Sequence, residues 1–212
     1  MDAPPASPTA AAARHSPAAE RNRGPILAAL QRLLPARGRA LEIASGTGQH
    51  VAFFAAGMPG WHWQPTEPDA AAFASIAAWC DAAGASNVAA PLRLDVRDDP
   101  WPVAAPWDAM FGANLLHIAP WDCCAALMRG AAAVLADGGW LLTYGPYLED
   151  EVPTAPGNLA FDADLRARDP AWGLRRRAAV EAEAAAVGLG LRARVAMPAN
   201  NLLLGFRRAA RR

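Results

Sequence analysis

Along most of the chain, segments with the apolar spacing of a helix alternate with short apolar runs typical of strands. Apolar residues spaced three and four apart predict helices over Pro25–Leu34, Gln49–Ala56, Ala70–Ala83, Pro120–Leu135 and Arg177–Val187. Short apolar runs predict strands over Ala40–Ile43, Trp61–Thr66, Leu92–Val96, Ala109–Ala113, Trp140–Tyr144, Leu189–Ala196 and Leu202–Arg207. Strands that alternate with helices of this length predict an α/β fold. We expect a doubly wound, mostly parallel seven-stranded sheet with an antiparallel C-terminal hairpin, turned at Pro198–Asn201.

Two segments fall outside this alternation. Residues 1–17 are rich in proline, alanine and serine, and they predict a disordered leader before a single domain over residues 18–212. Residues 145–173 contain several prolines and glycines and predict a long irregular loop. A loop of this length in a compact domain usually has a function.

Composition excludes several classes of protein. Twenty basic and twenty acidic residues cancel, which argues against a dedicated nucleic-acid binder. All the basic residues are arginine, so lysine chemistry, including a Schiff base or a P-loop lysine, is excluded. The three cysteines and four histidines lack zinc-ligand spacing, and we expect no metal. There is no 18-residue apolar run and no secretory pattern, so we expect a cytoplasmic protein that does not bind membranes.

A glycine turn follows the first predicted strand, in the segment Leu41 to His50. At such a turn the backbone can approach a ligand closely, and the next helix offers free N–H groups. A dinucleotide-binding turn would have glycine or alanine at its third position, where this chain has Val51. Glu42 precedes the turn and would repel a phosphate but suit a cationic ligand. Glu67 ends the second strand, 19 residues after Gly48, at the spacing of a carboxylate that binds ribose hydroxyls.

Together these motifs resemble a class I S-adenosylmethionine-dependent methyltransferase, a Rossmann-like fold. The resemblance covers residues 18–207 and rests on ordered motifs: E42-x-A-S-G-T-G48, E67, L94-D95-V96, N114-L-L-H-I118 and L135-A-D-G-G139. Further segments resemble the methyltransferase-like protein 26 family, whose substrate is unidentified: A18–I26, W63–E67, H117–W121, T143–Y147, F161–L174 and M197–L202. The chain departs from that family at Glu67, where a serine–aspartate pairing is expected, and Asp69 is an alternative ligand.

The resemblance implies a set of cofactor-binding residues for S-adenosylmethionine. Glu42 would hold the methionine end, Glu67 the ribose hydroxyls, and Asp95 with the Val96 backbone the adenine. The glycine turn would contribute contacts from Ala44, Ser45, Gly46, Thr47 and Gly48. Arg21 or Asn22 would meet the cofactor carboxylate. The alternatives are an arginine-paired carboxylate at position 42, helix or strand-end caps at 67 and 95, and a solvated charge run at 21–23.

Other residues at the carboxyl ends of the strands are candidates for the acceptor side. Asn114 would meet the methionine moiety or the acceptor. His117 is a candidate general base, because the ordinary histidine pKa of about 6.5 suits proton removal near neutrality, or else a structural histidine. Tyr144 is a second catalytic candidate, and Tyr147 would shape the substrate pocket, unless both simply pack. Trp172 in the long loop, with Phe161 and Arg166, would cover the acceptor or form a local cluster.

The sequence therefore predicts methyl transfer to an acceptor that we expect to be a small molecule. One alternative is an NAD-dependent oxidoreductase on the same sheet, which Val51 and Glu42 disfavour. Another is a non-catalytic cofactor-binding protein. Neither the acceptor nor the oligomeric state follows from the sequence, and no interleaving of aromatic and basic residues indicates RNA.

Overall fold

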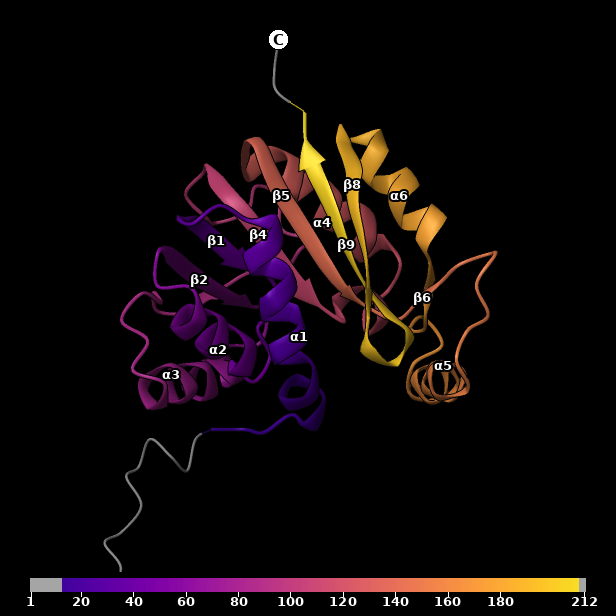
Figure 1. Ribbon diagram of the computed structural model, residues 1–212, viewed down its shortest axis with the longest axis horizontal. Coiled ribbons are helices and arrows are strands. Elements are labelled where there is room, and N and C mark those ends of the chain that lie inside the picture. Colours follow the sequence, from indigo (N-terminus) through magenta and orange to yellow (C-terminus); the bar gives the residue numbers. More distant parts are fainter. Residues whose placement is uncertain (1–12, 210–212) are drawn as a thin grey trace, which may run out of the picture.

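The computed structural model describes residues 13–209 (Figure 1). The helices are α1 (Pro17–Leu33), α2 (Gln49–Gly57), α3 (Phe73–Ala82), α4 (Asp122–Val134), α5 (Pro156–Arg168) and α6 (Arg177–Ala186), and short 3-10 turns are η2 (Ala70–Ala72), η3 (Leu115–His117) and η4 (Pro198–Asn200). The strands are β1 (Gly38–Glu42), β2 (Trp61–Glu67), β3 (Leu92–Arg93), β4 (Trp107–Ala113), β5 (Leu135–Gly145), β6 (Tyr147–Leu148), β7 (Arg175–Arg176), β8 (Leu189–Met197) and β9 (Asn201–Arg208).

A seven-stranded sheet forms the centre of the protein, in the order β3-β2-β1-β4-β5-β9-β8. Strands β1 to β5 run parallel, whereas β9 is antiparallel to both β5 and β8. The chain moves outward in one direction from β1 to β3 and then crosses back to place β4 on the other side of β1. Such a reversal leaves a crevice at the carboxyl ends of the strands, where α/β sheets bind ligands. The predicted fold is confirmed.

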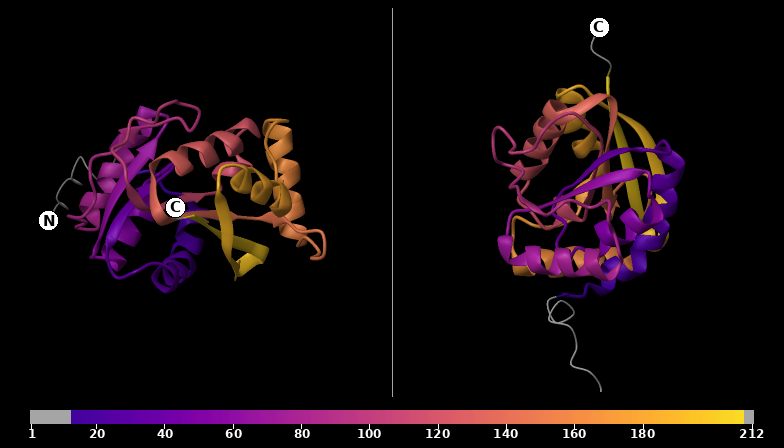
Figure 2. Two further views of the ribbon diagram at one scale, coloured as in Figure 1. Left: turned by 90° about the horizontal axis from the view of Figure 1, so that it is seen from above. Right: turned by 90° about the vertical axis from the view of Figure 1, so that its left-hand side faces the viewer.

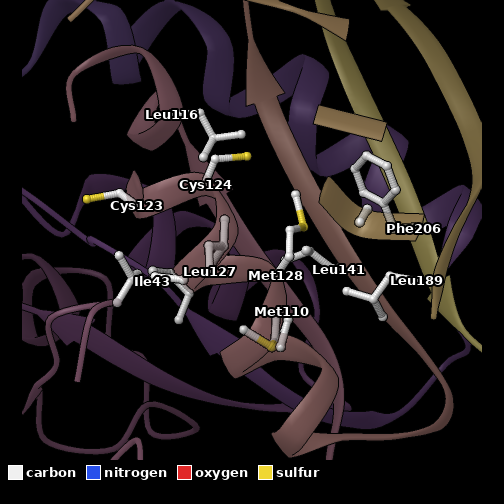
Figure 3. Close-up of a cluster of buried hydrophobic side chains, with 14 of the residues drawn as sticks. Ile43, Met110, Leu116, Cys123, Cys124, Leu127, Met128, Leu141, Leu189 and Phe206 are labelled. Atoms are coloured by element: carbon white, nitrogen blue, oxygen red, sulfur yellow. The ribbon is translucent and has the colours of Figure 1, made fainter. Parts of the chain in front are cut away.

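Helices cover both faces of the sheet and bury a core on each. One core joins Ile26 of α1, Phe54 of α2 and Ile76 of α3 to the sheet. The other joins α4 and α6 to the opposite face, where Met110, Leu127 and Leu141 meet (Figure 3), and Figure 2 shows α1 and α4 on opposite sides. Successive residues of β4 and β5 alternate between the two cores, which explains why these strands read as continuous apolar runs.

The first helix begins earlier than predicted. Helix α1 starts at Pro17, and the Ser16 side chain caps it by accepting a hydrogen bond from the Ala19 backbone N–H at 3.3 Å. Pro25, predicted in the first turn, lies inside the helix. Its missing N–H leaves the Arg21 carbonyl without an intrahelical donor, a loss that water can offset because Arg21 is exposed. Most of the predicted leader, residues 1–12, lies outside the described residues.

The predicted irregular loop over 145–173 is wrong. It contains the short strand β6, which pairs in parallel with β7, and the 13-residue helix α5. In α5 only Leu165 is buried, so the apolar stripe that identifies a helix in a sequence is missing. Figure 1 shows α5 beyond the carboxyl ends of the parallel strands, beside the turn between β8 and β9.

Smaller differences concern the third and fifth strands. Strand β3 is limited to Leu92–Arg93, so Asp95 and Val96 follow it instead of ending it. Strand β5 already begins at Leu135, ahead of the strand predicted over Trp140–Tyr144. Over residues 13–209, every helix is too short or too polar to cross a membrane.

Candidate active site

Three adjoining cavities follow the carboxyl edge of the sheet. The β2-side cavity, about 400 Å³, is lined by residues that include Gly46, Glu67, Asp95, Val96 and Trp172. The central cavity, about 200 Å³, is lined by residues that include Ser16, Glu42, Ser45, Thr47, His50 and Asn114. The α5-side cavity, about 400 Å³, is lined by residues that include Arg21, Asn22, Tyr144, Asn158, Phe161 and Asn201. Ala44, Gly46, Ala113 and Ile118 join the first two, and Ala18 and Asn114 join the last two, so the cavities form one groove.

The glycine turn places backbone at the junction of the first two cavities. Ala44 and Gly46 both have positive φ, at 54° and 57°, and both line the β2-side and central cavities. Gly48 has a different role. A Cβ at Gly48 would lie 2.5 Å from the Ile76 Cα atom, so this glycine permits close packing of α2 against α3 and lines none of the three cavities. Gly48 therefore has a packing role, and its contact with the cofactor stays a prediction.

Glu42 is a buried carboxylate in which one oxygen makes no hydrogen bond. It ends β1, is 2% exposed, and its Oε2 atom makes no hydrogen bond. Burial raises its pKa to about 8, and the nearby charge of Glu67 adds to this, whereas the Ser45 hydroxyl favours the ionised form. The buried Ser45 Oγ atom itself makes no well-formed hydrogen bond. Because Glu42 faces the central cavity, this arrangement can receive a cationic group.

The other two predicted carboxylates lie on the β2-side cavity. Glu67 ends β2, and its Oε2 atom accepts a hydrogen bond from the Gly46 N–H at 2.9 Å. Asp69, the alternative ligand, instead caps η2 by accepting from the Ala71 N–H, and it lines none of the three cavities. Asp95 pairs with Arg97 at 2.7 Å, and this bond lowers the Asp95 pKa. Glu42, Glu67 and Asp95 thus meet along one groove, in two joined cavities.

A contact between His50 and Asn22 connects the central and α5-side cavities. Burial lowers the pKa of His50 to about 4, helped by the charge of Arg23, so the ring is neutral at pH 7. Its Nε2 atom lies 2.6 Å from Asn22 Oδ1, a distance that suits an N–H donating to the amide oxygen. Burial raises the pKa of Tyr144, and the neighbouring Asn22 side chain and Arg21 charge oppose this rise. Tyr144 and Asn22 both line the α5-side cavity.

His117 and Tyr147 lie behind the groove rather than on it. His117 is fully buried, both ring nitrogens lack partners, and burial lowers its pKa to about 3. Its ring centroid lies 5.0 Å from that of Tyr147, whose hydroxyl donates to Thr143 Oγ1 at 2.8 Å. Neither side chain lines any of the three cavities. His117 instead contributes its backbone carbonyl, which accepts from the Gly173 N–H.

Two predicted residues line a different cavity from the one expected. Trp172, expected at the acceptor, lines the β2-side cavity that also holds Asp95. Arg21, expected at the cofactor carboxylate, lines the α5-side cavity and not the central one. Sequence reasoning missed Ser16, His50 and Asn158. His50 lies two residues after Gly48 of the glycine turn, and this position could have indicated it. Asn158 lies on a helix that the sequence pattern does not indicate.

Several solved methyltransferase structures have the same fold as this chain, although their sequence identity to it is low. The mitomycin 7-O-methyltransferase MmcR has a TM-score of 0.77 and 19% identity, over 91% of this chain and 54% of that one. CalO1, a methyltransferase in calicheamicin biosynthesis solved with S-adenosylhomocysteine, has a TM-score of 0.71 and 16% identity, over 89% and 54%. The S-adenosylmethionine-dependent methyltransferase SibL has a TM-score of 0.75 and 20% identity, over 90% and 55%.

This chain thus spans little more than half the length of these structures. Below 25% identity the match establishes the fold, and the site must be judged from its own residues. A family model described as "Protein of unknown function (DUF938)" matches residues 13–208, nearly the whole chain, and the protein therefore belongs to this family.

Proposed function

We propose that this protein is an S-adenosylmethionine-dependent methyltransferase that acts on a small-molecule acceptor. The observation that carries the proposal is Glu42: a buried carboxylate without a hydrogen-bond partner at Oε2, at the end of β1, facing a cavity beside the glycine turn. The motifs that resemble the methyltransferase-like protein 26 family support the same activity, and the fold is that of the solved methyltransferases.

The residues of the groove fit the cofactor at each of its ends. The unpartnered Glu42 oxygen suits the α-ammonium of the methionine moiety, and Glu67 on the neighbouring strand suits the ribose hydroxyls. Asp95 and the Val96 backbone suit the adenine, and Asp95 would share its carboxylate with Arg97. S-adenosylmethionine supplies a methyl carbon on a positively charged sulfur, which becomes a neutral thioether when an acceptor lone pair takes the methyl.

The chain's own residues would then act mainly by positioning. Asn114 lines both the central and α5-side cavities, so its amide can orient whatever crosses between them. Correct alignment of two bound reactants can supply about 7–11 kcal/mol of the barrier. Tyr144 lies on the α5-side cavity, and we assign it to the acceptor. His117 lies behind the groove with a pKa of about 3, and we assign it a positioning role through its carbonyl rather than the role of general base.

A thermal-shift experiment with S-adenosylhomocysteine tests the proposal. At a ligand concentration 100 times Kd, binding to the native state adds about 2.7 kcal/mol to the unfolding free energy, so the melting temperature rises. We expect this rise in the wild type and in the exposed control Glu151→Gln. Glu42→Gln should lose most of it. Equal stabilisation of Glu42→Gln and wild type would contradict the assignment of Glu42.

The same experiment separates the alternatives. NAD should give no shift, because Val51 is fully buried in the core where a dinucleotide-binding turn has a small residue. Stabilisation by NAD alone would favour the oxidoreductase. A protein that binds S-adenosylhomocysteine but transfers no labelled methyl to any acceptor in a cell extract would be a non-catalytic cofactor-binding protein.

A further inference from the structure

The α5-side cavity has a volume of about 400 Å³, separate from the carboxylates assigned to the cofactor. It adjoins the central cavity through Ala18 and Asn114, so a molecule bound there lies next to the methionine end of the groove. Within residues 13–209, the Asn114 side chain makes no hydrogen bond. Its amide is therefore free to contact a ligand at the boundary between the two cavities.

The charge on this cavity has one sign. Arg21 is the only charged residue on its lining, which includes no carboxylate. Across the part of the chain that the structure describes, Arg21 forms no ion pair, whereas Arg23, two residues further along α1, pairs with Glu20 and lies over the Phe53 ring. The Arg21 guanidinium is close enough to oppose the rise in the Tyr144 pKa. A cation without a partner, beside a neutral phenol, favours an anionic ligand.

The remaining walls of the cavity are apolar and held in place. Phe161 and two prolines supply flat apolar surface. The Asn158 Nδ2 group donates to the carbonyls of Ala199 and Asn200, and Asn200 Oδ1 accepts from the Ala155 N–H at 3.0 Å. These bonds hold the turn between β8 and β9 against the start of α5.

Backbone strain is concentrated at the same groove. Four non-glycine residues among those described have positive φ: Ala44, Asn114, Ala199 and Asn200. The first three line the cavities, and Asn200 adjoins two lining residues. Each such residue costs of the order of 1 kcal/mol and persists only when its surroundings fix it, which is typical of binding sites.

From these observations we propose that the α5-side cavity is the acceptor site and that it binds a small aromatic carboxylate. Arg21 pairs with the carboxylate at the rim, Phe161 packs against the ring, and the Tyr144 hydroxyl and Asn114 amide face the substituent that accepts the methyl. This inference rests on the proposed function, because it assumes that the central cavity holds the methyl donor. It also replaces the expected contact of Arg21 with the cofactor carboxylate.

Binding of salicylate and its neutral analogue salicylamide tests the proposal. Both are titrated into wild-type protein saturated with S-adenosylhomocysteine and followed by calorimetry or ligand-observed NMR. We expect salicylate to bind more tightly than salicylamide. Arg21→Gln should lower the affinity for salicylate about five- to tenfold and leave salicylamide unchanged. Arg23→Gln is the matched control on the same helix and should retain the preference for the carboxylate.

The affinity for S-adenosylhomocysteine, measured separately for each variant, keeps the two proposals apart. We expect Arg21→Gln to bind it as the wild type does. If Arg21→Gln lowers the affinity for S-adenosylhomocysteine as strongly as Glu42→Gln does, Arg21 holds the cofactor. In that case the inference fails, while the proposed function stands. Absence of salicylate binding to the wild type, or an unchanged preference in Arg21→Gln, also overturns the inference. Absence of S-adenosylhomocysteine binding contradicts the proposed function instead.

Discussion

Glu42 combines the role in cofactor binding that we propose with an unfavourable effect on folding. Its pKa of about 8 in the folded protein lies above its ordinary value of 4.5, so the folded state holds a proton that the unfolded state has released between these two pH values. The stability contribution of this group therefore falls as pH rises from about 4.5 to about 8. A buried carboxylate that costs stability is typical of a functional residue.

Glu42→Gln should therefore stabilise the ligand-free protein at pH 8 and change it little at pH 4.5. The expected gain at pH 8 is of the order of a few kcal/mol, because each pKa unit corresponds to about 1.4 kcal/mol. Urea denaturation of the variant and the wild type at both pH values measures the difference. A Glu42→Gln protein that is less stable than wild type at pH 8 would contradict the burial of an unpartnered charge.

His117 has the opposite pH dependence. Its pKa of about 3 lies below the ordinary 6.5, so the unfolded state binds a proton that the folded state excludes. Stability from this group is present above about pH 6.5 and is lost as pH falls towards 3. When the pH falls from 7 to 5, the free energy of unfolding should decrease less in His117→Leu than in the wild type. Urea denaturation at both pH values measures this difference. The exposed His62→Leu serves as control, and equal pH profiles in all three proteins would exclude this role.

At the residue scale, the sequence predicts the parts of the site that are local along the chain. Gly46 belongs to the glycine turn, Glu42 precedes it by four residues, and Glu67 ends the next strand. Their convergence at the groove therefore follows from the strand–turn–helix pattern. The burial of His117 depends on Tyr147 and on the loop at Gly173, which come from distant segments. No local pattern indicates that burial.

At the element scale, the start of α1 connects the N-terminal segment to the site. The Arg14 backbone N–H donates to Ser75 Oγ at 2.9 Å, its carbonyl accepts from Trp79 Nε1 at 2.8 Å, and the Ser16 N–H donates to Gln49 Oε1. Ser16 also lines the central cavity. The proline signal at position 25 misplaces this start, because a helix can continue through a proline when the carbonyl it leaves free is exposed.

Ser16→Ala should destabilise the protein by about 1 kcal/mol, because it removes the cap of α1. Since the same residue lines the central cavity, the change should also weaken S-adenosylhomocysteine binding. Urea denaturation and calorimetry measure the two effects, with Ser86→Ala, which is exposed, as control. Stability and affinity equal to those of the control would show that the first turn of α1 forms without this cap.

At the scale of the whole molecule, strand order determines where the site lies. The sequence predicts the fold because strands and helices alternate with clear periodicity, and the reversal at β1 and β4 places the groove at the carboxyl edge. The α5-side cavity is less predictable. It is built from α5 and the turn between β8 and β9, which meet only through tertiary bonds such as that from Asn158 to Asn200. The lining of the β2-side and central cavities is therefore predictable from the sequence, and the lining of the α5-side cavity is not.

The most direct test of the central claim is calorimetry of S-adenosylhomocysteine binding at pH 7 in two buffers with different ionisation enthalpies. With a pKa of about 8, Glu42 is mostly protonated in the free protein and should ionise when it meets the ligand's ammonium group. We expect the wild type to release about one proton and Glu42→Gln to release none and to bind more weakly. No binding, or binding with the same proton release in both proteins, would contradict it.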